Sequence, residues 1–170
     1  VHVEPFGGYS RKYKDIKDLP EGATVAIPNE GSNAGRALLL LQKNGLIGLR
    51  AQGAAGATLV TPADITDNPK KIKIVQAEAP QLPRALDDVD AAIINGNYAL
   101  EAGLTPAKDA IVLETADHNP YANLLVTTPK LVNDPRILQL AKDLTSPQVA
   151  QYIRQHYNGS VIPVSDVNTQ

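Results

Sequence analysis

The residues with the most potential for chemistry lie in one short segment between a predicted strand and a predicted helix. Residues 27–36 read IPNEGSNAGR and precede an aliphatic run at residues 37–41. A loop of small polar residues lets backbone N–H groups converge at a helix N-terminus, where the helix dipole favours an anion. Arg36 adds a planar guanidinium that matches a carboxylate. The segment predicts a seat for a ligand carboxylate; the alternative is a capped helix whose Arg36 forms a surface ion pair.

Two asparagines could bind the charged groups of a small zwitterionic ligand together with Arg36. Asn95 follows a predicted buried strand, and Asn123 follows Tyr121 in a polar loop. An amide both donates and accepts hydrogen bonds, which suits a zwitterion with an ammonium and a carboxylate, although both asparagines also suit ordinary turns. Ligands of open α/β sheets collect at the carboxyl ends of the strands, so we expect a cleft there. The residues expected to converge on it are Asn33, Arg36, Gln81 and Asn95.

Little in the sequence supports catalysis, a bound metal or a cofactor. The histidines at positions 2, 118 and 156 lack the short spacing of a metal site. There is no nucleophile elbow, P-loop or dinucleotide fingerprint. Asp87 and Asp88 are interpreted as solvated or capping residues rather than as a catalytic pair. We therefore expect a binding protein without a cofactor, not an enzyme.

Composition narrows the classes of partner. The chain has 170 residues and a net charge of -2, with no basic stripe, so nucleic acid is not expected. Its longest aliphatic run, residues 37–41, is far shorter than the roughly 20 residues that cross a bilayer. Cysteine is absent, which fits an oxidising extracytoplasmic compartment. Methionine is absent too, and from this we expect a processed or truncated segment whose targeting sequence lies upstream of Val1.

Apolar patterning predicts alternating strands and helices. Strands are expected at residues 24–27, 72–78, 90–94, 111–114 and 124–127. A helix is expected from Asn33 to Asn44, with Ser32 as N-cap and Gly45 after the C-cap. Residues 52–57 predict an exposed loop, and from Pro135 the pattern is helical with a break at residues 146–147. Strands separated by helices favour an α/β fold with parallel pairing.

Several segments together resemble the NlpA-type lipoproteins, the methionine-binding components of methionine ABC importers. They are VEPFGGYS (3–10), VAIPN (25–29), SNAGRALLLL (32–41), EAPQLPR (78–84), LDDVDAAIIN (86–95) and PYAN (120–123). The resemblance extends over essentially the whole chain, in order. It implies that Arg36 holds the ligand carboxylate and that Asn95 and Asn123 contact the α-amino and carboxylate groups. Asn33 and Tyr121 complete the implied ligand-binding set.

The resemblance also implies an architecture. The expected fold is a type II periplasmic-binding-protein α/β fold of two lobes that close by a hinge, with one complete lobe and part of the other. Residues 1–9 would form a crossing and the end of lobe 1, residues 10–114 lobe 2, residues 115–123 a second crossing and residues 124–170 the C-terminal part of lobe 1. Family members carry a further N-terminal stretch that packs around the methionine side chain. Nothing like it occurs here, so selectivity for that side chain cannot be read from these residues.

The implied function is extracytoplasmic capture of an amino acid, L-methionine in the first place, for delivery to an ABC permease. The implied location is the periplasm or cell surface, as a lipoprotein anchored by an N-terminal lipid whose cysteine is absent from this sequence. One alternative is a methionine-containing dipeptide or another small amino acid as ligand. The other is a surface or interaction module that associates with itself, because an incomplete lobe exposes apolar surface.

Overall fold

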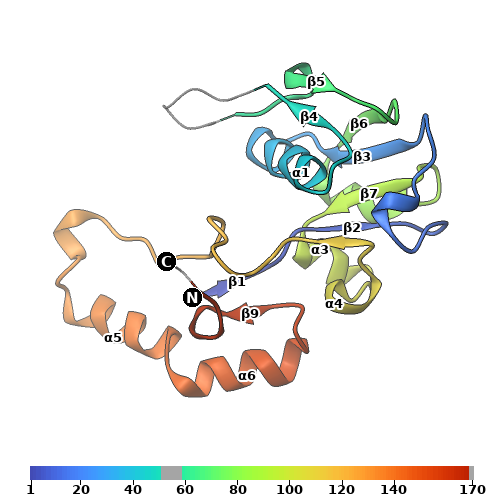
Figure 1. The fold of residues 1–170 in the computed structure, drawn as a ribbon. Coiled ribbons are helices and arrows are strands. Elements are labelled where there is room, and N and C mark those ends of the chain that lie inside the picture. Colours follow the sequence, from blue (N-terminus) through green and yellow to red (C-terminus); the bar gives the residue numbers. More distant parts are fainter. Residues whose placement is uncertain (51–58, 169–170) are drawn as a thin grey trace. The chain divides into compact units, whose positions relative to one another are not determined.

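The computed structural model describes residues 1–50 and 59–168, so the loop predicted at residues 52–57 lies outside them. The chain forms two compact units (Figure 1). Unit 1 consists of Val1–Pro5 and Glu114–Gln170, and unit 2 consists of Phe6–Leu113. The chain therefore passes from one unit to the other twice.

Unit 2 is built on a five-stranded mixed sheet. Its strand order is β6 (Lys73–Ala77), β3 (Thr24–Pro28), β7 (Ala91–Ile94), β2 (Gly7–Tyr9) and β8 (Val112–Leu113). β3 pairs in parallel with β6 and β7, which confirms the parallel pairing predicted from the sequence. β2 runs antiparallel to β7 and β8. This strand was not predicted, because two of its three residues are glycines, which have low strand propensity.

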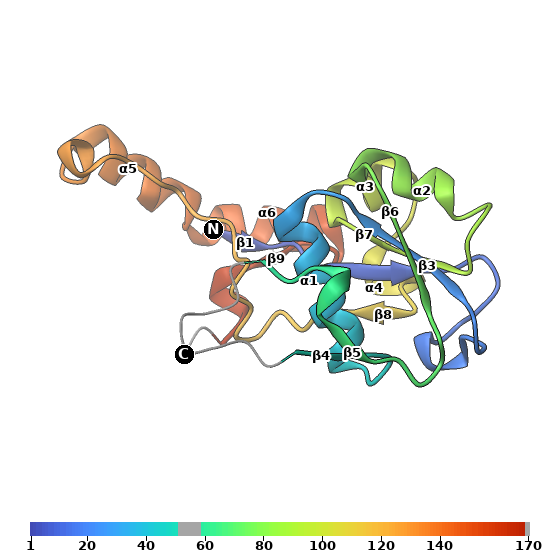
Figure 2. The ribbon, with the colours of Figure 1, turned by 90° about the horizontal axis from the view of Figure 1, so that it is seen from above.

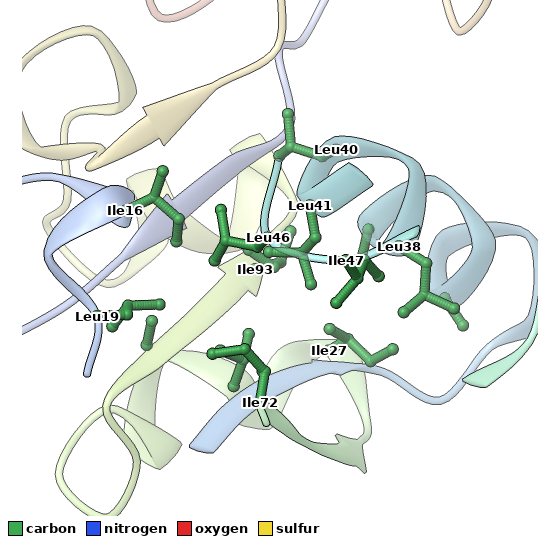
Figure 3. Close-up of a cluster of buried hydrophobic side chains, with 14 of the residues drawn as sticks. Ile16, Leu19, Ile27, Leu38, Leu40, Leu41, Leu46, Ile47, Ile72 and Ile93 are labelled. Atoms are coloured by element: carbon green, nitrogen blue, oxygen red, sulfur yellow. The ribbon is translucent and has the colours of Figure 1, made fainter. Parts of the chain in front are cut away.

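Helices cover both faces of this sheet, and the strand residues alternate between them. Val25, Ile27 and Ile93 join the core beneath α1 (Gly31–Lys43), whose Leu38 and Leu41 are buried in the same cluster (Figure 3). The intervening residues Ala26, Ala92 and Ile94 pack in a second cluster with residues of α2 (Leu82–Ala85) and α3 (Gly96–Glu101). Successive side chains of β3 and β7 thus point to opposite faces of the sheet. Because helices cover both faces, the sequences of these strands are continuously apolar.

The end of α1 follows its sequence signal. Gly45 has a φ of 77°, in the left-handed region that glycine adopts without steric penalty. Its N–H donates to the Gln42 carbonyl at 2.9 Å, and the N–H of Leu46 donates to the Leu41 carbonyl at 3.1 Å. These two bonds form a Schellman motif, which satisfies carbonyls that the helix itself leaves unpaired. Gly45 is thus the residue after the C-cap, as predicted.

Short elements complete unit 2. They are the 3₁₀ helices η1 (Ile16–Asp18), η2 (Pro62–Asp64) and η3 (Ala79–Gln81), the antiparallel pair β4 (Gly48–Leu49) and β5 (Ile65–Asp67), and the helix α4 (Pro106–Asp109).

Unit 1 contains β1 (His2–Val3) paired antiparallel with β9 (Ile162–Pro163), and the helices α5 (Pro135–Leu144) and α6 (Pro147–Tyr157). Unit 1 also contains two short 3₁₀ helices, η4 (Pro129–Leu131) before α5 and η5 (Val164–Asp166) after β9. The predicted break between the helices is confirmed (Figure 2). Ser146 is the N-cap of α6, and its hydroxyl accepts a hydrogen bond from the N–H of Val149 at 3.3 Å.

The strand predicted at residues 124–127 is wrong. That segment is not assigned to any strand, and Leu124 and Val126 are 74% and 80% exposed. Its aliphatic composition suits a strand, but a strand also requires a partner for its backbone groups. α5 likewise has no buried residue although its sequence is amphipathic. Within residues 1–50 and 59–168, no helix is long and apolar enough to span a membrane.

Candidate functional site

The N-terminus of α1 lies where the parallel strand β3 ends, and Glu30 is its N-cap. The Glu30 carboxylate accepts hydrogen bonds from the Ser32 N–H at 3.3 Å and from the Ser32 hydroxyl at 2.5 Å. These bonds, led by the one from the hydroxyl, hold the pKa of Glu30 below its usual range. The prediction of Ser32 as N-cap is therefore wrong: the helix begins at Gly31, its N-cap is Glu30, and Ser32 donates to that carboxylate.

This cap changes the expected role of the loop. The sequence predicted that backbone N–H groups at the start of the helix would receive a ligand carboxylate, but the carboxylate of Glu30 already accepts from one of them. A second anion there would meet a like charge. Among the predicted site residues, the cation suited to an external carboxylate is Arg36.

Arg36 is half-buried and lies on α1, one turn after Asn33. Its guanidinium carbon is 4.8 Å from the centroid of the Phe6 ring, and Phe6 is fully buried. This distance is within the range of a cation–π interaction, which fixes one face of the guanidinium against the ring. Phe6 was not identified from the sequence, since a single aromatic residue beside Gly7 carries no local signal.

Asn33 and Asn95 are brought together across 62 positions of sequence. Asn95 is the first residue after β7 and caps α3 through its backbone only. Its Nδ2 donates to Oδ1 of Asn33 at 3.3 Å. The other amide atom of Asn95, Oδ1, is buried and has no hydrogen-bond partner among the described residues. A buried acceptor without a donor is costly, so this atom marks a place for a donor from a ligand or a water molecule.

The remaining candidates come from other elements. Gln81 ends η3 after β6, and within the described residues its side chain makes no hydrogen bond to Asn33 or Asn95. Tyr121 and Asn123 belong to unit 1. The N–H of Tyr121 donates to Oδ1 of Asn119 at 2.8 Å, and the N–H of Asn123 donates to the His2 carbonyl at 2.8 Å. The structure thus joins Asn33 to Asn95, with Arg36 one helical turn away.

Two cavities in unit 1 do not contain any of the predicted site residues. One, of about 200 Å³, is lined by Leu144, Ala150, Ile153 and neighbouring residues. The other, of about 500 Å³, is lined by Val3, His118, Leu124 and neighbours. Their linings are mostly apolar and include no arginine, lysine or carboxylate side chain, so neither cavity supplies an arginine or lysine for a ligand carboxylate. Within the described ranges, no three histidine or acidic side chains are grouped to hold a metal ion.

Solved structures of substrate-binding proteins share this fold. A nutrient-binding protein from Burkholderia cenocepacia, solved bound to methionine, superposes with a TM-score of 0.89 at 48% identity, over 96% of this chain and 67% of the other. A periplasmic substrate-binding protein of an ABC transporter from Coxiella burnetii gives a TM-score of 0.86 at 44% identity, with the same coverage. The α/β fold of the periplasmic-binding-protein type, expected from the sequence, is confirmed.

The sequence profile of the NlpA lipoprotein family matches residues 1–165, and the chain belongs to this family. It is 47% identical to outer membrane lipoprotein 2 of Mannheimia haemolytica over 94% of this chain and 56% of that protein. It is 44% identical to the D-methionine-binding lipoprotein MetQ of Salmonella typhi over 94% of this chain and 58% of that protein. The chain thus spans somewhat more than half the length of these relatives.

Proposed function

We propose that this chain binds the α-amino-acid head group of methionine for uptake by an ABC importer. The carrying observation concerns Oδ1 of Asn95, a buried acceptor without a partner among the described residues. Asn95 is hydrogen-bonded to Asn33, and Asn33 lies one helical turn from the Arg36 cation. An α-amino acid carries the two complementary groups, an ammonium donor and a carboxylate acceptor. Arg36 would hold the carboxylate and Asn95 the ammonium.

The choice of methionine comes from the relatives. The Burkholderia protein was solved with methionine, and several relatives are named for D-methionine binding. The same relationship supports the rest of the proposal: an ABC permease as partner and an extracytoplasmic, lipid-anchored location. Binding rather than catalysis is the proposal, because substrate-binding proteins release their ligand unchanged. Tyr121 and Asn123 remain part of the proposal as further ligand contacts of unit 1.

Isothermal titration calorimetry of the 170-residue chain with L-methionine tests this function. We expect saturable binding of one ligand in the parent and a loss of about 30-fold or more in affinity for Arg36→Met, since truncating one member of a charge pair leaves the other unpaired. Lys43→Met, at the other end of α1, is the matched control. A parent chain without measurable methionine binding, or an Arg36→Met variant that binds as the parent does, contradicts the proposal.

Further titrations separate the ligand classes. D-methionine tests the stereochemistry, and a methionine-containing dipeptide tests the alternative ligand. Asn123→Ala and Tyr121→Ala, each measured alone, test the proposed contacts of unit 1. Tighter binding of the dipeptide than of either amino acid would replace the free amino acid as the proposed ligand.

We propose self-association as a second candidate property. Nine of the twelve exposed large hydrophobic residues within the described ranges belong to unit 1, among them Leu124, Val126 and Leu138. Exposed apolar side chains in this number favour association between copies. Light scattering over a range of concentrations tests it, and a monomer at every concentration contradicts it.

A further inference from the structure

A directional chain of hydrogen bonds begins at Glu30 and ends at Asn95. Oε2 of Glu30 accepts from Nδ2 of Asn33 at 2.5 Å. Oδ1 of Asn33 accepts from Nδ2 of Asn95 at 3.3 Å. Oδ1 of Asn95, at the far end, is buried and has no partner among the described residues.

The direction of this chain follows from the chemistry of its first member. An ionised carboxylate only accepts hydrogen bonds, whereas an amide side chain donates from nitrogen and accepts at oxygen. Glu30 therefore requires Asn33 to turn its nitrogen toward it, which leaves the Asn33 oxygen to face Asn95. That oxygen in turn requires the nitrogen of Asn95. The Asn95 oxygen is the atom left over, and it must be an acceptor.

We propose that Glu30 is a positioning residue that sets the polarity of Asn95, so that the site presents an acceptor and selects an α-ammonium over an α-hydroxyl group. This inference rests on the proposed function. Glu30 does not touch the ligand in this scheme; it acts through Asn33. With the acceptor fixed, an ammonium gains a charge-assisted hydrogen bond, and a hydroxyl gains only a neutral one.

The substitution that separates polarity from packing is Glu30→Gln, which keeps the size of the side chain. A glutamine offers either its oxygen or its nitrogen to Asn33, so both orientations of the Asn33 and Asn95 amides become accessible. In the flipped orientation Asn95 presents its nitrogen, which repels an ammonium and donates to a hydroxyl. The preference for the amino group should therefore fall.

Calorimetry with L-methionine and with its α-hydroxy analogue, 2-hydroxy-4-(methylthio)butanoate, measures this preference. For Glu30→Gln we expect the methionine affinity to fall about threefold to tenfold and the affinity for the hydroxy acid to change less than about twofold. Glu21→Gln is the matched control: it makes the same charge change at an exposed residue whose carboxylate pairs with Lys71 at 2.9 Å. We expect both affinities of that control to equal those of the parent.

The outcomes separate this inference from the proposed function. Equal losses for the two ligands, or no loss for either, in Glu30→Gln overturn the inference while methionine binding by the parent upholds the function. A parent that binds neither ligand overturns the function, and with it the selection of an ammonium over a hydroxyl.

The hydrogen-bond chain has a second test that needs no ligand. In the NMR spectrum of the ligand-free chain, the side-chain amide resonances of Asn33 and Asn95 should move together as acid protonates Glu30. The Glu30→Gln variant should lose this common titration. If the Asn33 resonance moves and that of Asn95 does not, Glu30 does not orient the Asn95 amide through Asn33, and the inference is overturned.

Discussion

The Arg36 guanidinium carbon lies 4.8 Å from the centroid of the Phe6 ring, and Phe6 is the first residue of unit 2. The ring is fully buried in the main core cluster, so its position is fixed by packing. A cation held against a fixed ring loses less side-chain freedom when it engages a ligand. This contact ties the ligand-binding cation of the proposed site to the core of the unit.

Fluorination of Phe6 tests the electrostatic part of this contact. The chain contains one phenylalanine, so growth on fluorinated phenylalanines modifies Phe6 alone. Fluorine weakens the negative face of the ring with little change of shape, and a cation–π interaction contributes about 0.5–2 kcal/mol. We expect affinity for methionine to fall stepwise with the number of fluorines, by about threefold to tenfold for three of them. Calorimetry measures the series.

The same proteins provide a control. In the protein with one fluorine on Phe6, the ¹⁹F resonance should shift when Arg36→Met removes the cation, and the fold should persist by circular dichroism. Methionine affinity that is constant across the fluorinated series would mean that Phe6 only fills space.

The strands β3 and β7 and the helix α1 of unit 2 were predictable from the sequence, because local patterns decide them. β3 and β7 are uninterrupted apolar runs, and α1 ends at a glycine in the left-handed region. The segment at residues 124–127 has the same local pattern but is not a strand. Strand formation depends on a neighbour in space, which no local pattern reports.

The candidate site was predictable only in part. Arg36, Asn33 and Asn95 were identified from residue type and strand-end position, and the hydrogen bond between the two asparagines supports their grouping. The role of Glu30 as N-cap and as partner of Asn33 was missed, because a glutamate before a helix is usually a surface residue. Its effect depends on which amide atom of Asn33 faces it, and that orientation exists only in three dimensions.

Asp90 should make unit 2 sensitive to acid. Its Oδ2 accepts from the Thr24 N–H at 2.8 Å, and Oδ1 accepts from Nζ of Lys12 at 3.4 Å. The bond from Thr24, and after it Lys12, holds the pKa of Asp90 below its usual range. A lowered pKa adds stability above the unfolded pKa of about 4, and this is lost as pH falls through the folded value.

Urea unfolding at several pH values checks this. In Asp90→Asn we expect the midpoint to depend less on pH in the acid range than it does in the parent. Lys12→Met should change the acid dependence less, because the bond from Thr24 is the larger cause. An acid dependence unaltered in Asp90→Asn contradicts the assignment.

Tyr9 and Gly7 should be coupled in stability. The Tyr9 ring is buried, burial raises the pKa of its hydroxyl well above the usual range, and the hydroxyl has no partner among the described residues. Tyr9→Phe should therefore change the free energy of unfolding by less than about 1 kcal/mol. A Cβ at Gly7 would lie 2.9 Å from the Tyr9 hydroxyl oxygen, so Gly7→Ala should destabilise by about 1–3 kcal/mol.

A double-mutant cycle measures the coupling by urea unfolding. Gly7→Ala should cost less in the Tyr9→Phe background, because the closest atom is gone, although ring carbons at 3.1 Å remain. Additive effects of the two substitutions would show that the hydroxyl does not oppose a Cβ at position 7.

Hydrogen exchange should distinguish α5 from the strands of unit 2. α5 has no buried residue and Leu138 is 53% exposed, whereas every residue of β7 is buried. Amide protection follows the free energy of local opening, which is small where few apolar contacts must break. We expect α5 amides to exchange orders of magnitude faster than those of β7, with α6 between them because Ile153 is buried. Hydrogen-exchange mass spectrometry measures the exchange rates of these three elements, at two protein concentrations. Protection of α5 equal to that of β7 in the dilute sample contradicts the prediction, and protection that appears only in the concentrated sample identifies α5 as a surface covered by a second copy.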